Sequence, residues 1–540
     1  MKRSLFLVLV VALLLALIAP AMAQDGKVLR IDLQQEADSL NPMYYDQWFA
    51  GLLSDLMLSP AWYFDNNLQA VPALVTEIPS LENGGVNEDG TVVTLKLRDD
   101  AFWTDGEPIT AEDFVFTYQM IVDPANTPLG RYPYETRVKS VEASDPQTVV
   151  VTFNETFAPW QAFLFLSVLP EHVLAPVFEA DGTLDNADWN RNPTVTSGPF
   201  KFVEWQAGSS MTLAANENYF GGKPNLDSLF IRFVPEDTTI VQSLIAGDTD
   251  VATYIPFPDT GPLKEAGTIE FVLAPSGFNE AWRYNVNPET AHPAMLDINV
   301  RKALALAFNR DKINADLNAD QTYTPASFWE GTPYVRPNAE PIPYDVAMAA
   351  QLLDDAGWVD SDGDDIRDKD GVKLELRYVS NERLVRKDIQ AIVKQDLADL
   401  GVSVNTFNYP SIFDSYANGG VLAIGDFDIA EWSSVPAWPD PDTSQFLCEE
   451  ITSADNPDGS NSQGYCNEEV DALFSEQART LDTAKRAEIF QQIDQLMTDD
   501  VIWVGIWYDA DLWTFNENVL NTEFSGADPW WNAVNWDIAS

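Results

Sequence analysis

The chain has 540 residues and carries 84 acidic against 31 basic side chains, which gives a formal net charge of −53 at pH 7. Such a surface repels phosphate backbones and anionic lipid, so the charge argues against nucleic-acid binding. Hydrophobic residues make up 46% and charged residues 21% of the chain, which predicts a folded protein, and its length predicts two or more domains.

The first 23 residues have the pattern of a secretory signal peptide. Lys2 and Arg3 precede an apolar stretch over residues 5–18. Ala21, Met22 and Ala23 form a small-x-small cleavage site, so the mature chain is expected to start near Gln24. The apolar stretch is short for a membrane span, although an uncleaved anchor is the alternative interpretation. The residue directly after the cleavage site is Gln24 and not cysteine. We therefore expect a protein secreted across the cytoplasmic membrane, periplasmic or extracellular, without a lipid anchor.

The first half of the mature chain alternates strands with short helices. Thr110 stands where a helix cap is expected, and Asp113, three residues later, completes a capping-box pattern. Apolar residues alternate with polar ones over residues 92–98, as in a half-buried strand. The other expected elements are strands at 28–33, 138–151 (two strands around a turn), 199–205, 211–214 and 229–234, and a helix at 238–246.

The second half contains longer helices. Asp345 is expected to cap a helix that ends before Gly357, a residue type that favours the position after a helix end. Further helices are expected at 300–308, 383–400 and 483–497, and a strand at 402–407. Strands and helices mix along the whole chain, so we predict an α/β fold class.

Cys448 and Cys466 are the only cysteines of the chain. A secreted protein with two cysteines close in sequence most often pairs them, so we predict a disulfide; two free buried thiols are the alternative. A loop of this size would stabilise the fold by about 3 kcal/mol in the chain-entropy model.

Segments with recognisable motifs extend over most of the mature chain; they are residues 102–114, 196–200 with 203–205, 218–224, 300–310 and 352–358. Together, and in this order, they resemble the bacterial extracellular solute-binding proteins of family 5, which serve ATP-driven (ABC) importers of oligopeptides, dipeptides, nickel and some oligosaccharides. The resemblance implies a two-lobed periplasmic-binding-protein-like fold (type II, cluster C) with an extra subdomain in the first lobe.

By the same resemblance, residues 24–282 form lobe I, with a subdomain at about 65–190, and residues 283–504 form lobe II. Residues 505–540 would return to lobe I. Residues 282–286 and 502–507 would cross between the lobes, and both segments are apolar and strand-like. A ligand that touches both lobes would bind the closed state better and shift the population toward closure.

Two groups of candidate ligand-binding residues lie near the proposed cleft. Tyr44, Tyr45 and Trp48 follow the first strand and could stack on a ligand, or could pack in the core. Phe278, Asn279 and Glu280 precede the proposed crossing, where backbone often lines the cleft in the family, and at least one of the three is expected to contact ligand.

The segment 432–442 contains three further candidates, Trp432, Trp438 and Asp440. In peptide-binding relatives an acidic residue shortly after the first tryptophan holds the amino group of the peptide, whereas here residues 433–435 are Ser, Ser and Val. A tryptophan pair with hydroxyl groups suits a sugar face equally well. Asp440 is the remaining amine partner or a turn residue. Arg383 and Arg386 open a helix, and one of them could bind a ligand carboxylate, or both could pair with nearby acids at the surface.

Asp360, Asp362, Asp364 and Asp368 alternate in an acidic turn. Calcium takes several such oxygen ligands, but Asp365 stands where an EF-hand loop needs glycine. The alternatives are a structural calcium site and a solvated turn, and no other cofactor is expected.

The function we expect is an importer-linked binding protein for peptides or peptide-like solutes, active as a monomer and delivering its solute to an ABC permease. An oligosaccharide-binding protein of the same family is the alternative. A secreted glycosidase is a further one, because paired carboxylates are not excluded. Enzymatic activity is otherwise not indicated: His172 and His292 stand in no catalytic motif, and the shortage of histidine also disfavours nickel.

Overall fold

The computed structural model describes residues 26–45, 47–67, 69–318, 322–410, 412–434, 441, 443–457, 459–526 and 528–539. For residues 258, 274–277, 417 and 509–511 only the backbone is described. The predicted signal peptide over residues 1–23 therefore lies outside the described residues. Within them, none of the helices combines the length and apolarity needed to cross a membrane.

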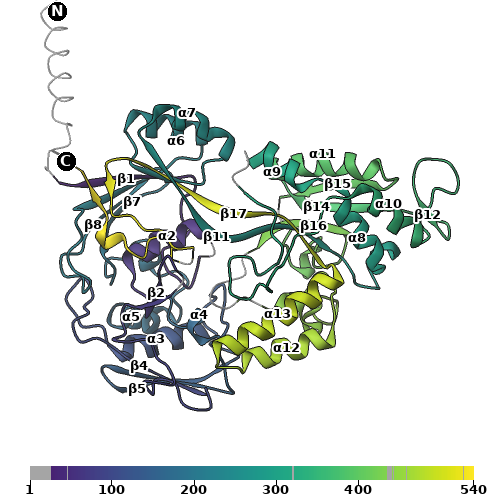
Figure 1. The fold of residues 1–540 in the computed structure, drawn as a ribbon. Helices are drawn as coiled ribbons and strands as arrows, with labels where there is room; N and C mark the ends of the chain where they lie inside the picture. Colours follow the sequence, from purple (N-terminus) through teal and green to yellow (C-terminus); the bar gives the residue numbers. More distant parts are fainter. Residues whose placement is uncertain are drawn as a thin grey trace, which may run out of the picture.

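The fold is α/β, as predicted, and a ten-stranded sheet runs through both lobes in the order β15-β14-β16-β11-β17-β10-β1-β9-β8-β7 (Figure 1). Its first-lobe part centres on β1 (Val28–Leu33), which lies parallel to β9 and β10. The remaining first-lobe strands are β7 (Phe200–Gln206), β8 (Ser210–Ala215), β9 (Ser228–Phe233), β10 (Val251–Thr253), β18 (Val519–Leu520) and β19 (Asp537–Ile538). The helices are α2 (Trp48–Met57), α6 (Asp237–Ala246) and α7 (Gly261–Ala266).

A subdomain with its own core extends the first lobe. Its three-stranded sheet has the order β4-β6-β5, and α3 packs beside it. The predicted capping box opens α3, where the Thr110 backbone N–H donates to Asp113 at 2.8 Å. Buried residues between 43 and 189 form this core, with Trp62, Trp103 and Phe114 among the largest. The elements are β2 (Trp62–Phe64), β3 (Ala70–Pro72), β4 (Val92–Lys96), α3 (Ala111–Val122), β5 (Val138–Asp145), β6 (Thr148–Phe153), α4 (Trp160–Phe163) and α5 (Glu171–Asp181).

The second lobe places helices around the other end of the long sheet. Strand β14 lies parallel to both β15 and β16, so the carboxyl ends of these strands meet at one edge. The predicted cap of α10 is present: Asp345 accepts from the Met348 N–H at 2.9 Å. The elements are α8 (Ile298–Ala307), α9 (Arg310–Asn318), α10 (Val346–Asp355), β12 (Asp368–Lys369), β13 (Val372–Lys373), β14 (Glu375–Asn381), α11 (Leu384–Ala398), β15 (Ser403–Tyr409), β16 (Ile429–Ser434), α12 (Glu468–Ala478) and α13 (Thr483–Asp500).

Two long antiparallel strands, β11 (Ile269–Tyr284) and β17 (Trp503–Asn516), join the lobes (Figure 1). Their first-lobe end packs through Ile269 and Trp513, and their second-lobe end through Trp282 and Ile506. Between these ends the register shifts twice, between residues 275 and 279 and between 280 and 281. A register shift bends a strand locally. The strands thus extend well beyond the predicted crossing segments 282–286 and 502–507, which cover only their second-lobe ends.

Candidate functional site

The carboxyl ends of the parallel strands β14, β15 and β16 form one edge of the second lobe, next to the crossing strand β11. In open α/β sheets ligands bind outside this edge. Strand β14 is followed directly by Arg383 and helix α11, and β16 ends at Trp432, Ser433 and Ser434. This edge, which we call the strand-end site, therefore carries two of the predicted positions, Arg383 and Trp432.

Trp432 is held on one side by a buried arginine of the crossing strand. The guanidinium of Arg283 lies 4.0 Å from the centre of the Trp432 ring and donates to the Trp432 carbonyl at 2.8 Å. It also donates to the hydroxyl of Ser434. The ring of Phe413, a 64% exposed residue, approaches Trp432 edge-on at 5.8 Å. Burial lowers the pKa of Arg283 to about 9, so this cation stays charged at neutral pH while it fixes the end of β16.

A buried ion pair holds the next residue. Arg386 of α11 makes two hydrogen bonds to Glu280 of β11, at 3.0 and 2.9 Å, and both residues are almost completely buried. The Ser433 hydroxyl contacts both partners, at 2.8 Å from Glu280 and 2.9 Å from Arg386. Burial alone would raise the pKa of Glu280, but the charge and the hydrogen bonds of Arg386 hold it below its usual value. The pair is therefore ionised and structural.

Glu431 lies in the same cluster and is fully buried. One of its oxygens accepts from the Tyr378 hydroxyl, which in turn accepts from the Trp282 indole N–H at 2.8 Å. The other oxygen has no hydrogen-bond partner among the described residues. Burial, followed by the negative charge of Glu280, raises the pKa of Glu431 well above its usual value. Both observations favour the protonated form.

Arg383, Phe278 and Asn279 take different positions around this edge. Arg383 is exposed at the cap position of α11, and its contact with a ligand stays a prediction. Phe278 is half-buried. Asn279 is fully buried, and its amide donates to the Phe328 carbonyl at 3.0 Å. The side chain of Asn279 therefore supports the second lobe from within, and ligand contact by the backbone at this point stays a prediction.

The aromatic group after β1 packs against the cores of the first lobe. Tyr44 contacts the core of the subdomain, and Tyr45 and Trp48 contact the core of the main sheet. The Trp48 ring lies 4.9 Å from that of Tyr254 and 5.9 Å from that of Trp513. All three side chains are half-buried. The structure thus favours packing over ligand stacking for most of their surface.

Two of the predicted ligand residues, Trp438 and Asp440, lie outside the described residues. Their neighbour Pro441 is described, and it lines a cavity of about 890 Å³ that is walled by both lobes. The first-lobe wall comes from residues 132–163 of the subdomain, and the second-lobe wall from residues 441–479. A volume of this size is typical of small-molecule sites.

The predicted disulfide between Cys448 and Cys466 is present, with an S–S distance of 2.07 Å. Both cysteines line the cavity between the lobes. The bond ties the 3-10 turn at residues 448–450 to the segment that leads into α12. It therefore holds one wall of the cavity in place.

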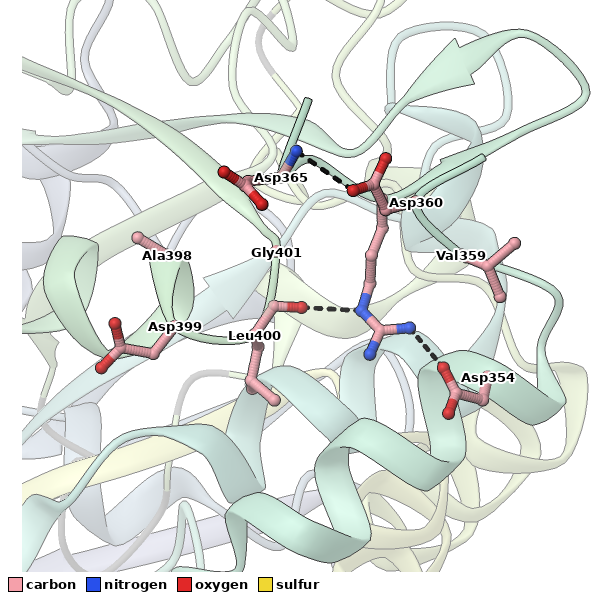
Figure 2. A pocket seen from close by; sticks show the side chains of 9 residues that line it. Asp354, Val359, Asp360, Asp365, Ala398, Asp399, Leu400 and Gly401 are labelled. Atoms are coloured by element: carbon pink, nitrogen blue, oxygen red, sulfur yellow. Dashed lines mark hydrogen bonds and ion pairs between the residues drawn. The ribbon is translucent and has the colours of Figure 1, made fainter. Parts of the chain in front are cut away.

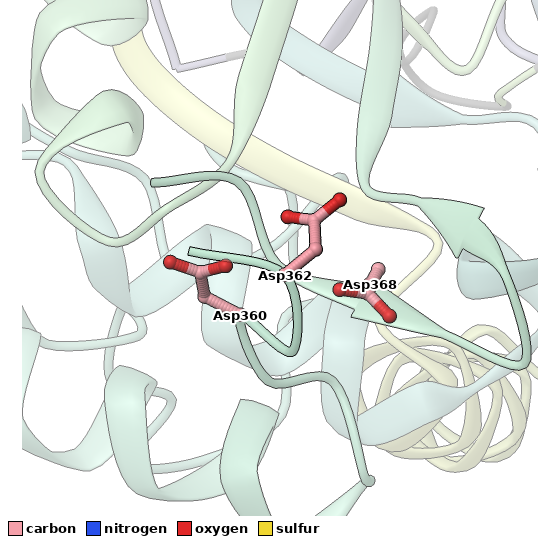
Figure 3. Close-up of side chains that lie close together, drawn as sticks. All are labelled: Asp360, Asp362 and Asp368. Atoms are coloured by element: carbon pink, nitrogen blue, oxygen red, sulfur yellow. The ribbon is translucent and has the colours of Figure 1, made fainter. Parts of the chain in front are cut away.

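The acidic turn lies at the surface of the second lobe (Figure 3). Carboxylate oxygens of Asp360, Asp362 and Asp368 come within 4.8 Å of one another. However, Asp360 accepts from the Gly363 N–H at 2.7 Å, and Asp368 accepts from the Ser361 hydroxyl at 2.7 Å. These hydrogen bonds use oxygens that a calcium ion would need.

The remaining carboxylates of the turn contact a lysine. Lys373 pairs with Asp364 and lies 3.3 Å from Asp362, and its hydrogen bond lowers the pKa of Asp364. An ammonium group at this position competes with a cation. The calcium hypothesis stays a prediction, and the geometry favours the solvated turn.

A surface pocket of about 540 Å³ beside this turn contains one cation, Arg367 (Figure 2). Its guanidinium donates to Asp354 at 2.5 Å and to the carbonyls of Leu400 and Trp358 at 2.7 and 2.6 Å. The cation therefore joins the ends of α10 and α11, and the pocket is best explained by the packing of these helices.

The sequence analysis named Glu280 as a candidate for ligand contact, whereas the structure pairs it with Arg386; it missed Arg283 and Glu431, which with Glu280 organise the strand-end site. One signal was present: each is a charged residue within a strand-like apolar run, and such residues are almost never fully buried unless they are paired. Which charges pair could not be read from the sequence, because the partners lie about 100 to 150 residues apart along the chain.

Comparisons with known proteins agree with this architecture. The family model described as "Bacterial extracellular solute-binding proteins, family 5 Middle" matches residues 69–449. The chain is 26% identical over 541 residues to the oligopeptide-binding protein AppA of Bacillus subtilis, covering 96% of this chain and 92% of AppA.

Two solved structures illustrate the fold. AppA of Bacillus subtilis in complex with a nonapeptide matches with a TM-score of 0.76 at 24% identity, over 96% of this chain and 100% of AppA. NikA of Brucella suis in complex with Fe(III)-EDTA matches with a TM-score of 0.80 at 20% identity, over 95% and 99% of the two chains. The same fold thus carries chemically different ligands, so the ligand has to be argued from the site.

Proposed function

The chain belongs to the bacterial extracellular solute-binding proteins of family 5, and from this we propose that it is the extracytoplasmic component of an ABC importer that closes around a peptide and delivers it to the permease. As a family member it is a binding component and not an enzyme. The proposal includes a monomeric protein without a lipid anchor.

The observation that supports this function most directly is the cavity between the lobes. Its walls come from both lobes, which are joined by the two long strands β11 and β17. A solute in this space contacts both walls in the closed state and only one in the open state. Binding therefore favours closure by the difference in contact free energy.

The strand-end site favours a peptide over a sugar. The sugar alternative relied on hydroxyl groups beside Trp432, but Ser433 is hydrogen-bonded to Glu280 and Arg386, and Ser434 accepts from Arg283. These hydroxyls are engaged within the protein. We propose that Arg383, exposed at the cap of α11, binds a peptide carboxylate together with the helix N-terminus.

Thermal unfolding in the presence of candidate solutes tests this function. Because a ligand that binds only the native state stabilises it by mass action, di- to nonapeptides should raise the melting temperature with concentration. Cello- and xylo-oligosaccharides at equal concentrations should leave it unchanged. Stabilisation by the sugars alone would replace the peptide proposal by the oligosaccharide alternative. Stabilisation by neither set would contradict a small-solute function, and turnover of a chromogenic glycoside would favour the glycosidase.

A further inference from the structure

The two lobes contact each other directly beside the cavity that they both line. The Ala158 N–H of the first lobe donates to the Ala478 carbonyl of the second lobe at 2.9 Å. Leu481 packs against Gly90 so closely that a Cβ atom at Gly90 would lie 2.8 Å from the leucine side chain. In Figure 1 the helices α12 and α4 meet at this place, opposite the crossing strands. The cavity of about 890 Å³ therefore lies between two lobes that touch each other.

The first-lobe wall of this cavity is aromatic. Tyr132, Phe157 and Phe163 all line it. The Tyr132 ring lies 5.2 Å from the Phe163 ring and 6.2 Å from the Phe157 ring, both edge-on, and the two phenylalanine rings are 6.4 Å apart. Phe157 is buried in the subdomain core, whereas Tyr132 is exposed and Phe163 half-buried, so the latter two rings offer the aromatic surface that can attract a cation.

The second-lobe wall of the same cavity is acidic. Glu449, Glu450, Glu468 and Asp471 line it, and among the described residues none of them makes an ion pair. The N-terminus of α12 favours the negative charge of Glu468 and Asp471. Glu449 and Glu450 belong to a separate short turn and lack that compensation.

The charges of this wall already repel one another. Burial, and then the charges of Glu449 and Glu468, raise the pKa of Asp471. The cavity contains two cations of its own, and the first-lobe one, Arg137, is paired with Glu155 at 3.0 Å. The other, Arg479, donates to the Ser475 hydroxyl at 3.0 Å. A further positive charge would therefore be favoured between the two walls.

We propose that this cavity holds a cationic group of the ligand, an ammonium or guanidinium, between the aromatic wall of the first lobe and the acidic wall of the second. The inference rests on the proposed function and makes it more specific: the preferred ligands are peptides that carry lysine or arginine. A cation bound in this way bridges the lobes, so it also favours the closed state.

Isothermal titration with three pentapeptides that differ only at one position, lysine, glutamine or glutamate, tests the proposal on the full mature protein. The measurements are made at about 0.15 M salt, where exposed charges are screened beyond about 8 Å. We expect the lysine peptide to bind at least about tenfold more tightly than the glutamine peptide, and the glutamate peptide to bind most weakly.

Three variants locate the effect. The double substitution Glu449→Gln with Glu468→Gln removes two charges from the acidic wall, and Phe163→Leu removes a ring but keeps apolar volume. Each should reduce the preference for lysine about three- to tenfold. The matched control, Glu179→Gln with Glu265→Gln, removes two exposed carboxylates on α5 and α7, outside the cavity, and should leave the preference within about twofold.

The outcomes separate the inference from the function on which it rests. Equal binding of the three peptides overturns the cationic preference and leaves the peptide function standing. A lysine preference that survives in both cavity variants, or that falls equally in the control, shows an effect of the overall charge and overturns the assignment to this cavity. Binding of no peptide overturns the proposed function itself.

Discussion

The strand-end site and the interlobe cavity both contain carboxylates, but the two regions differ in how far these carboxylates are buried and whether they are paired. At the strand ends Glu280 is buried against Arg386, and Glu431 is buried beside Tyr378 with a raised pKa. In the cavity the acids of the second-lobe wall keep contact with solvent and lack ion pairs among the described residues. The first arrangement holds the protein together, whereas the second leaves charge for a ligand. Burial and partners, more than residue type, decide which role a carboxylate takes.

The largest expected effect comes from removing the partner of a buried charge. Arg386→Met leaves Glu280 buried without its cation, which should lower the free energy of unfolding by about 3–5 kcal/mol, measured by urea denaturation. Arg383→Met, three residues earlier and exposed, is the matched control and should change stability by less than about 0.5 kcal/mol. Equal effects of the two variants would contradict the stabilising role of the buried Arg386–Glu280 pair.

The disulfide is expected to have the next largest effect. The double variant Cys448→Ser with Cys466→Ser should lose about 3 kcal/mol of stability through the greater freedom of the unfolded chain. Because the bond ties down one wall of the cavity, the affinity for peptide should fall as well. The loss of stability in Arg386→Met, by contrast, arises at the strand-end site. A melting temperature that is unchanged by the double serine variant would show that the loop is held by its other contacts.

Titration of Glu431 gives a smaller, pH-dependent effect. Folding raises the pKa of Glu431, so the native state keeps a proton that the unfolded state releases. The contribution of this group to stability is therefore complete below the usual pKa of about 4.5. It is lost as the pH rises toward the pKa of the folded state. Glu431→Gln abolishes this loss. The difference in unfolding free energy between variant and wild type should grow by up to about 1.4 kcal/mol per pH unit above pH 4.5. Parallel pH profiles would show that Glu431 is already ionised.

The acidic turn should show the smallest effect. Asp360→Asn keeps an acceptor for the backbone N–H groups that the side chain now binds, so stability should change by less than about 0.5 kcal/mol. Adding calcium or a chelator should leave the melting temperature of the wild type unchanged. An increase with calcium that is lost in Asp360→Asn would restore the calcium hypothesis.

Local features of the fold were predictable from the sequence. The capping box of Thr110 and Asp113, the cap of Asp345, the strand β1 and the disulfide all form as expected. In each case the interacting groups are close in sequence, or are the only candidates of their type. The packing of the aromatic residues near the start was harder to predict, because the Trp48 ring contacts that of Trp513, more than 450 residues away in the chain.

The sequence by itself determined the class of fold and the membership in a binding-protein family, because hydrophobic periodicity, caps and family motifs are local and act at many positions together. Only the tertiary structure decided which charges are neutralised. Glu280 and Glu449 look alike along the chain, yet one lies against a guanidinium in the core and the other lines a cavity between two lobes. The free energy of a charge depends on its surroundings in space, and those surroundings come from segments that the chain brings together only when it folds.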